Sequence, residues 1–238
     1  MKKILALILA AVCLLTIAAC GKKDGDAKGE GVMTYAEYAA AALDTEVTVE
    51  TYVQAKQSWW DNKATFYTQD KDGGYFIYEM ACSEEEFNKL TPGTKIKVTG
   101  YKSEWSGEVE ITDAKYEIED GNYVAPATDV TAELGKDSLV NFQNRFVAFK
   151  GMTVEAYDES GAAFAYKNAE EQTDDLYFKV SKDGATYDFC VEFYLTGKDT
   201  DVYKAVEGLK VGDVIDLEGF LYWYNGANPH ITSVKPAA

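Results

Sequence analysis

The chain has 238 residues and a formal net charge of −17, because 23 Lys and Arg stand against 40 Asp and Glu. A surface with this charge repels the phosphate backbone that Lys and Arg neutralise in nucleic-acid complexes, so the charge disfavours DNA or RNA as a partner. The length suits two domains of about 100 residues each, and hydrophobic residues at 47% suffice for two cores.

The first residues have the features of a secretory signal. Lys2 and Lys3 precede an apolar run at 4–17, and Cys20 follows a series of small residues. This arrangement resembles the lipobox of bacterial lipoproteins, a family in which the cysteine receives a diacylglycerol and the signal is cut before it. The resemblance implies a signal peptide at 1–19 and lipidation of Cys20. It also implies an extracytoplasmic protein, held by acyl chains to a bacterial cell membrane.

Two alternatives stay open for this segment. One is a transmembrane anchor, although the apolar stretch is shorter than the about 20 residues that a spanning helix needs. The other is an ordinary signal peptide cut after Ala19, which would leave the same mature chain without lipid.

A flexible tether is predicted at 20–31, where glycine and charged residues leave almost nothing apolar. Thr34 and Glu37 then have the spacing of a capping box, which predicts a short helix through the Ala-rich stretch to Leu43.

The remainder of the chain contains an internal repeat. Residues 90–101 align with 209–220 at a constant offset of 119, and both segments read Leu-x-x-Gly-x-x-Ile-x-(Val/Leu)-x-Gly. Gly107 and Gly226 keep the same offset, and after one inserted residue Ile111-Thr112 matches Ile231-Thr232. Two upstream pairs follow in the same order, 71–73 with 182–184 and 48–52 with 153–157. Shared residues in one order indicate a structural unit that is used twice.

The unit is predicted as three strands, a helix and two strands. In the first copy the strands are expected at 46–53, 64–69, 75–80, 95–100 and 108–114, with the helix beginning after Ser83. In the second copy the strands are expected at 146–156, 175–180, 186–194, 213–222 and 229–234, with the helix at 200–206. This order is that of the OB-fold, a five-stranded Greek-key barrel.

The Leu-x-x-Gly segments resemble those in OB-like modules of secreted bacterial lipoproteins, over about 46–118 and 146–235. We therefore expect a mostly β protein with short helices, built from two tandem OB-fold-like barrels; a pair of small β-sandwiches is the alternative. The expected domains are 32–120, with the N-terminal helix, and 131–238, joined by a linker at 121–130 and with a helix at 134–142 opening the second.

Aromatic residues in loops are the candidate ligand-binding residues. In OB-folds the loops between strands one and two and between strands four and five flank the binding face. Those loops are expected to hold Trp59, Trp60, Trp105, Tyr222, Trp223 and Tyr224. Aromatic rings in such a groove stack on sugar rings or bases. The alternative is that the rings plug the barrel ends or pack the two domains together.

The predicted function is non-catalytic binding of an oligosaccharide or a peptide. The alternatives are an assembly lipoprotein with a protein partner in the envelope, and a single-stranded nucleic-acid binder, which a groove lined by Lys95, Lys97, Lys102 and Lys115 would favour.

No enzyme, cofactor or metal site is predicted. The chain has one His and no Cys-x-x-Cys, Gly-x-Ser-x-Gly or Gly-Lys-Ser/Thr motif. Cys82 and Cys190 fall in different repeats, and we expect both to be unpaired.

Overall fold

The computed structural model describes residues 28–237. The predicted signal peptide, the lipidation site at Cys20 and most of the predicted tether lie outside this range. The helix predicted after Thr34 is present as α1 (Tyr35–Ala40), with the capping box between Thr34 and Glu37 formed. Among residues 28–237, no helix has the length and apolarity required to cross a membrane.

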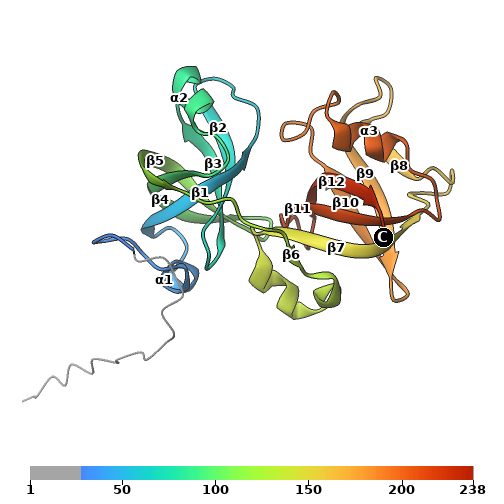
Figure 1. Cartoon of the computed structure of the whole chain (residues 1–238), viewed down its shortest axis with the longest axis horizontal. Helices are drawn as coiled ribbons and strands as arrows, with labels where there is room; N and C mark the ends of the chain where they lie inside the picture. The colour runs from blue at the N-terminus through green and yellow to red at the C-terminus, as the bar shows by residue number, and fades with distance from the viewer. Residues whose placement is uncertain (1–27, 238) are drawn as a thin grey trace, which may run out of the picture.

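Five strands close the first barrel in the order β1-β2-β3-β5-β4 (Figure 1). They are β1 (Glu46–Lys56), β2 (Lys63–Gln69), β3 (Gly74–Ala81), β4 (Thr94–Trp105) and β5 (Glu108–Asn122). Helix α2 (Glu84–Lys89) lies between β3 and β4 and begins with the predicted capping box at Ser83. Strands β3 and β5 pair in parallel, with Phe76 opposite Glu110. This closure, with a helix between strands three and four, is that of the OB-fold.

The second barrel closes in the same way, because β7 pairs with both β11 and β9. Its strands are β7 (Phe146–Glu155), β9 (Thr173–Lys182), β10 (Ala185–Val191), β11 (Val214–Phe220) and β12 (His230–Pro236). Helix α3 (Asp201–Glu207), capped by Thr200, lies between β10 and β11. Strands β10 and β12 pair in parallel through Cys190 and His230. The prediction of two OB-fold barrels is therefore confirmed, and the alternative of β-sandwiches is wrong.

The repeated glycines have the same backbone roles in both barrels. Gly93 and Gly212 both have φ near +93°, in the left-handed region that favours glycine. At Gly100 and Gly219 the pairing register shifts, and a Cβ atom would lie 2.7 Å and 2.2 Å from a carbonyl oxygen of the neighbouring strand. The shared sequence pattern thus records two places where only glycine fits the backbone.

The element boundaries differ from the prediction in several places. Strand β5 continues to Asn122, past the first domain's expected end at 120, because it stays paired with β4 as far as Thr94. Trp105 therefore ends β4 instead of lying in a loop. The segment expected as a helix at 134–142 contains the 3-10 helix η2 (Asp137–Phe142), which has no side-chain cap, after η1 (Thr131–Glu133).

Two short strands were not predicted. They are β6 (Thr128–Asp129), which pairs with β7 inside the expected linker, and β8 (Phe164–Asn168), which pairs with β9. In addition, β10 ends at Val191, before the end expected at 194, and a turn follows it.

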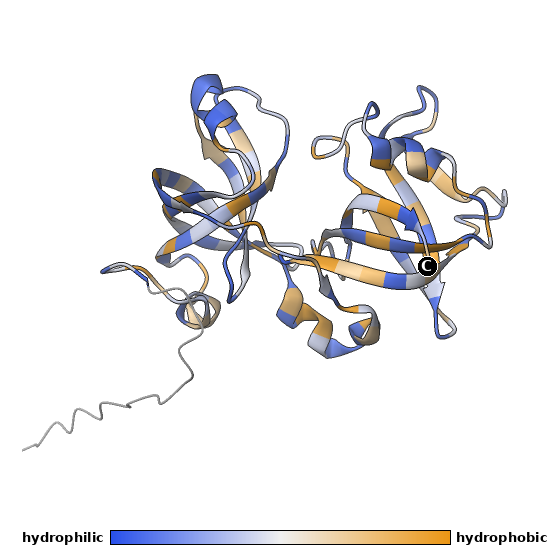
Figure 2. Cartoon of the chain, in the orientation of Figure 1, coloured by the Kyte–Doolittle hydropathy of each residue, from blue (hydrophilic) through white to orange (hydrophobic). Residues whose placement is uncertain are grey.

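Each barrel has its own apolar core, and a third apolar cluster joins them. Apolar and polar residues follow one another along the strands of both barrels (Figure 2), so each strand turns one face to a core. The third cluster, here called the interface cluster, consists of Tyr67, Phe76 and Phe220, all buried between the barrels. The Tyr67 ring lies 4.6 Å from the Phe220 ring, centroid to centroid.

A candidate ligand cleft between the barrels

Polar contacts hold the two barrels together around the interface cluster. The Tyr67 hydroxyl lies 2.6 Å from Nδ1 of His230, and both groups are buried. Burial lowers the pKa of His230 to about 3, so this histidine is neutral at pH 7. The backbone N–H of Asn225 donates to the carbonyl of Ser106, so the tips of two hairpin-type loops meet.

Glu108 is the most deeply buried carboxyl group at this junction. Its side chain is on β5, and its Oε2 accepts hydrogen bonds from the backbone N–H of Trp223 at 2.8 Å and from Nε2 of Gln143 at 3.2 Å. Burial raises the pKa of Glu108 well above its usual range, despite these donors. Both donors belong to the second half of the chain, so Glu108 connects the barrels.

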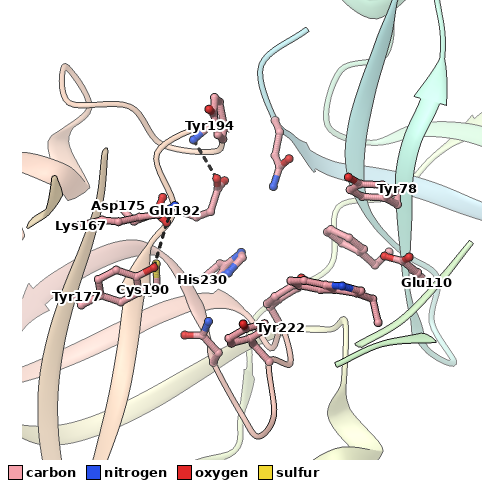
Figure 3. A pocket seen from close by; sticks show the side chains of 15 residues that line it. Tyr78, Glu110, Lys167, Asp175, Tyr177, Cys190, Glu192, Tyr194, Tyr222 and His230 are labelled. Carbon is pink, nitrogen blue, oxygen red and sulfur yellow. Dashed lines mark hydrogen bonds and ion pairs between the residues drawn. The ribbon is translucent and has the colours of Figure 1, made fainter. Parts of the chain in front are cut away.

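Beside this junction the barrels separate and enclose a cleft of about 680 Å³ (Figure 3). Barrel one contributes Phe76, Tyr78, Trp105 and Glu110 to its walls, and barrel two contributes Glu192, Tyr194, Tyr222, Tyr224 and His230. The volume lies in the range of about 300–1,000 Å³ that small-molecule sites occupy.

Aromatic rings cover much of the cleft. The Tyr222 ring stacks on His230 at 4.3 Å between centroids and meets the Phe76 ring edge-on at 5.3 Å. At the mouth of the cleft, Trp105 and Tyr224 lie 5.2 Å apart, and each is about half exposed. These two rings have open surface that a planar or ring-shaped ligand can contact.

Three carboxyl groups line the cleft, Glu110 from barrel one and Asp175 and Glu192 from barrel two, and the two glutamates have strongly raised pKa values (Figure 3). Burial, followed by repulsion from Glu79, raises the pKa of Glu110 to about 7. Burial also raises the pKa of Glu192 to about 7, although its oxygens accept backbone hydrogen bonds from Tyr194 and Leu195. Both groups are therefore partly ionised at neutral pH, and their charge responds to what occupies the cleft.

Lys167 and Asp175, which also line the cleft, are already paired with other residues. Lys167 lies 3.1 Å from Asp175 and 3.7 Å from Asp174. Asp175 also accepts from the hydroxyl of Tyr177 and from the backbone of Phe193. Beside the two glutamates there is thus one internally paired cluster of a lysine and two aspartates.

The thiols are inert. In the described part of the chain both Cys82 and Cys190 are unpaired and buried. Burial raises the pKa of both, that of Cys190 well above its usual range, which opposes thiolate formation.

The structure places the predicted aromatic residues in the cleft, in a neighbouring groove or on the barrel cores, and Trp59 both lines the groove and packs on the first core. Trp105, Tyr222 and Tyr224 line the cleft. Trp60 is exposed and lies in a neighbouring groove of about 570 Å³, which shares Tyr78 and Tyr194 with the cleft.

Two of the predicted aromatic residues are packed. The Trp59 indole packs on the first core and donates to the carbonyl of Cys82 at 3.0 Å. Trp223 packs against the second core, lies over Gly107 and is away from the cleft walls. These two rings match the alternative that some aromatics have packing roles.

Sequence reasoning missed Glu110, Glu192, Tyr78 and Tyr194. Glu110 directly precedes the core residue Ile111 on β5. Adjacent strand residues point to opposite faces, so the sequence predicts that Glu110 points outward to solvent. Only the second barrel, which covers this outer face of β5, makes it a site residue.

The lysines that would have favoured nucleic acid do not line the cleft. Lys95 forms ion pairs with Glu50 and Glu119. Lys102 is buried and donates to three carbonyls at the end of α1, those of Tyr38, Ala39 and Ala41. Residues 28–237 also contain no group of three or more His, Cys, Asp or Glu that could hold a metal ion.

No protein-family model matches this chain, and neither does any curated protein. Among solved structures, a murine DNA-binding protein bound to double-stranded DNA is similar over 80% of this chain and 96% of its own, with 12% identity and a TM-score of 0.37. A replication protein A heterotrimer bound to single-stranded DNA is similar over 84% of this chain and 51% of its own, with 10% identity and a TM-score of 0.35.

A deletion mutant of the single-stranded DNA-binding protein from Thermus aquaticus is similar over 81% of this chain and 94% of its own, with 12% identity and a TM-score of 0.29. At these TM-scores the similarities carry no argument about what this chain binds. They also give no support to the expectation that nucleic acid is disfavoured, which rests on the net charge and on the positions of the lysines. The OB-fold itself follows from the strand order of the two barrels.

Proposed function

We propose that this protein is a non-catalytic binding protein, lipid-anchored outside the cytoplasm of a bacterium, and that the cleft between its barrels binds an oligosaccharide. The observation that carries the proposal is the half-exposed ring pair of Trp105 and Tyr224 at the mouth of a cleft of about 680 Å³. Sugar rings have apolar faces that stack on aromatic rings, while their hydroxyls require the polar partners that this cleft also supplies.

The neighbouring groove extends the same surface. It continues from the cleft through Tyr78 and Tyr194 to Trp60, whose side chain is 67% exposed. An extended chain of sugar rings can therefore contact aromatic groups over its length, and this favours an oligomer over a single sugar. A peptide is the second candidate for the same surface, because aromatic residues and amides also bind extended backbones.

A non-catalytic role agrees with the chemistry of the cleft. Its thiol, Cys190, is held protonated by burial, and its histidine, His230, is neutral and hydrogen-bonded to Tyr67. Neither residue forms the pair of nucleophile and oriented base that covalent catalysis requires.

A glycan array probed with the full-length chain, solubilised in detergent, tests the ligand class. We expect saturable binding that weakens about tenfold or more in Trp105→Ala and in Tyr224→Ala, because ring stacking contributes about 1–3 kcal/mol per ring. Tyr101→Ala is the matched control, because Tyr101 is an exposed tyrosine on β4 outside the cleft. Absence of glycan binding by the folded protein contradicts the proposal and leaves a peptide or an envelope protein as the ligand to test.

The membrane anchor is tested separately by fractionation of cells that express the protein. Cys20→Ala should move the protein from the membrane fraction to the soluble extracytoplasmic fraction, because two acyl chains are needed for stable anchoring. Cys13→Ala is the matched control, since Cys13 lies within the apolar run upstream of the predicted cut. Equal membrane retention of both variants contradicts lipidation at Cys20.

A further inference from the structure

Glu110 lacks a partner although its side chain is almost fully buried. The residue is 7% exposed, and no hydrogen bond or ion pair joins its carboxylate to any other residue in the described part of the chain. Buried carboxylates in proteins are normally paired, because an isolated charge is costly to remove from water. The side chain lines the cleft near Tyr78, where a ligand can reach it (Figure 3).

The lysines of residues 28–237 that lie nearest this point are paired with other carboxylates. Lys63, the lysine next to Tyr78, forms an ion pair with Glu79 at 2.7 Å. Across the cleft, Lys167 is paired with Asp174 and Asp175. Burial keeps the His230 imidazole neutral, so it provides no positive charge for Glu110.

The other groups that face the cleft strengthen its negative potential. Glu110 and Glu192 line the cleft, and each raises the pKa of the Tyr222 hydroxyl, after the larger effect of burial. The net charge of −17 also favours the approach of cations from solution.

Aromatic rings around Glu110 fit an organic cation better than a metal ion. Phe76 lies opposite Glu110 in the strand pairing, and Tyr78, Trp105 and Tyr222 line the same cleft. Ring faces attract ammonium groups, with a contribution of about 0.5–2 kcal/mol. A metal ion would instead require several oxygen ligands, and no such cluster occurs within residues 28–237.

We infer that the cleft selects an oligosaccharide of amino sugars with free amines, and that an ammonium group of the sugar pairs with Glu110 while the rings stack on Trp105 and Tyr224. This inference rests on the proposed function and adds the charge of the ligand. The exposed faces of Trp105 and Tyr224 are the reason for proposing a sugar ring, and the unpaired carboxylate of Glu110 is the reason for proposing a free amine on it.

Calorimetry with two matched oligomers tests the inference. The probes are a glucosamine hexamer and its fully N-acetylated counterpart, which has the same rings and linkages but no positive charge. With the full-length chain in detergent at about pH 7, we expect the glucosamine hexamer to bind about tenfold tighter or more, which is about 1.4 kcal/mol.

Variants assign this preference to one carboxylate. Glu110→Gln retains the shape of the side chain, and it should abolish the preference, so that the two hexamers bind with similar affinity. Glu117→Gln removes the same charge from an exposed position on β5 and should leave the preference intact. Trp105→Ala should weaken binding of both hexamers, which non-specific attraction to an acidic surface would not show.

The outcomes separate the two proposals. Binding of the acetylated hexamer that equals or exceeds that of the glucosamine hexamer overturns this inference and leaves the proposed function standing. A preference for amines that survives Glu110→Gln also overturns it. Failure of both hexamers to bind, with thermal unfolding unchanged, overturns the oligosaccharide proposal and this inference together.

Discussion

Glu108 and Glu110 lie two residues apart on the same outer face of β5, both are buried, and they differ in their hydrogen-bond partners. Glu108 lies where the barrels touch, and it receives hydrogen bonds from Trp223 and Gln143. Glu110 lies where the barrels separate, and it has no partner among the described residues. A buried carboxyl with donors holds the structure together, whereas one without donors remains available to a ligand.

The largest expected difference between the junction and the cleft concerns stability. Phe220→Ala should lower the free energy of unfolding by about 3–5 kcal/mol, because it opens a cavity in the interface cluster. Trp105→Ala should change it by less than about 0.5 kcal/mol, since the ring is about half exposed. Urea denaturation measures the free energy of unfolding of both variants and of the parent protein. A comparable loss in Trp105→Ala would make that ring part of the junction and remove it from the ligand surface.

The second difference is in the pH dependence of stability. The folded-state pKa of Glu110, about 7, lies above its usual value near 4.5. Between these values the folded state keeps a proton that the unfolded state has lost, so stability falls as the pH rises through this window. Glu110→Gln cannot ionise, so the variant should gain about 1–3 kcal/mol over the parent protein when the pH is raised from about 5 to about 8.

Urea denaturation at both pH values measures this gain. Glu79, Tyr78 and Tyr222 surround Glu110, and all three are present in the parent and in the variant. Glu117→Gln, on the exposed part of β5, is the control and should show no such gain. If the free energy of unfolding changes with pH by the same amount in Glu110→Gln and in the parent protein, the Glu110 carboxyl group is solvated in the free protein.

The smallest expected effect concerns a single hydrogen bond at the junction. Tyr67→Phe removes the hydroxyl that lies 2.6 Å from His230 and should cost about 1 kcal/mol. Binding of either hexamer should stay within about twofold, because the hydroxyl supports the wall of the cleft and Tyr67 is not among the residues that line it. Thermal unfolding tests the expected loss of stability, and calorimetry tests the expected retention of binding. A large loss of binding would show that the junction and the cleft are coupled.

Local signals predicted the fold well. The capping boxes at Thr34 and Ser83 begin helices as expected, and the repeated glycine pattern marks the same strand in both barrels. Strands β6 and β8 are short edge strands, and η2 lacks a side-chain cap, so their sequences carry weak signals.

The site was predicted only in part, for a physical reason. Tyr222 and Tyr224 follow from the loop positions of the OB-fold, and Trp105, although it is the last residue of β4, lies beside them. The sequence does not distinguish Trp60 from the packed Trp59, because both have the same local pattern. Glu110 becomes a site residue because it shares a cleft with residues of the second barrel, such as Tyr222 and His230, which no local periodicity records.

The two walls of the cleft are the same surface of the repeated unit. Trp105 stacks on Tyr224, which occupies the same position 119 residues later, and Ser106 accepts a hydrogen bond from Asn225, its own equivalent. Glu110 corresponds to His230, since each pairs in parallel with the third strand of its barrel.

Identical positions that meet across an interface are the mark of a two-fold dimer. A single-barrel ancestor that dimerised in this way would have formed a cleft with two identical walls. Fusion of two such copies would let each one mutate alone, and the equivalent positions now hold the acid Glu110 and the neutral imidazole of His230. Unlike walls would distinguish the two directions of a bound chain, which the identical walls of a symmetric dimer cannot do.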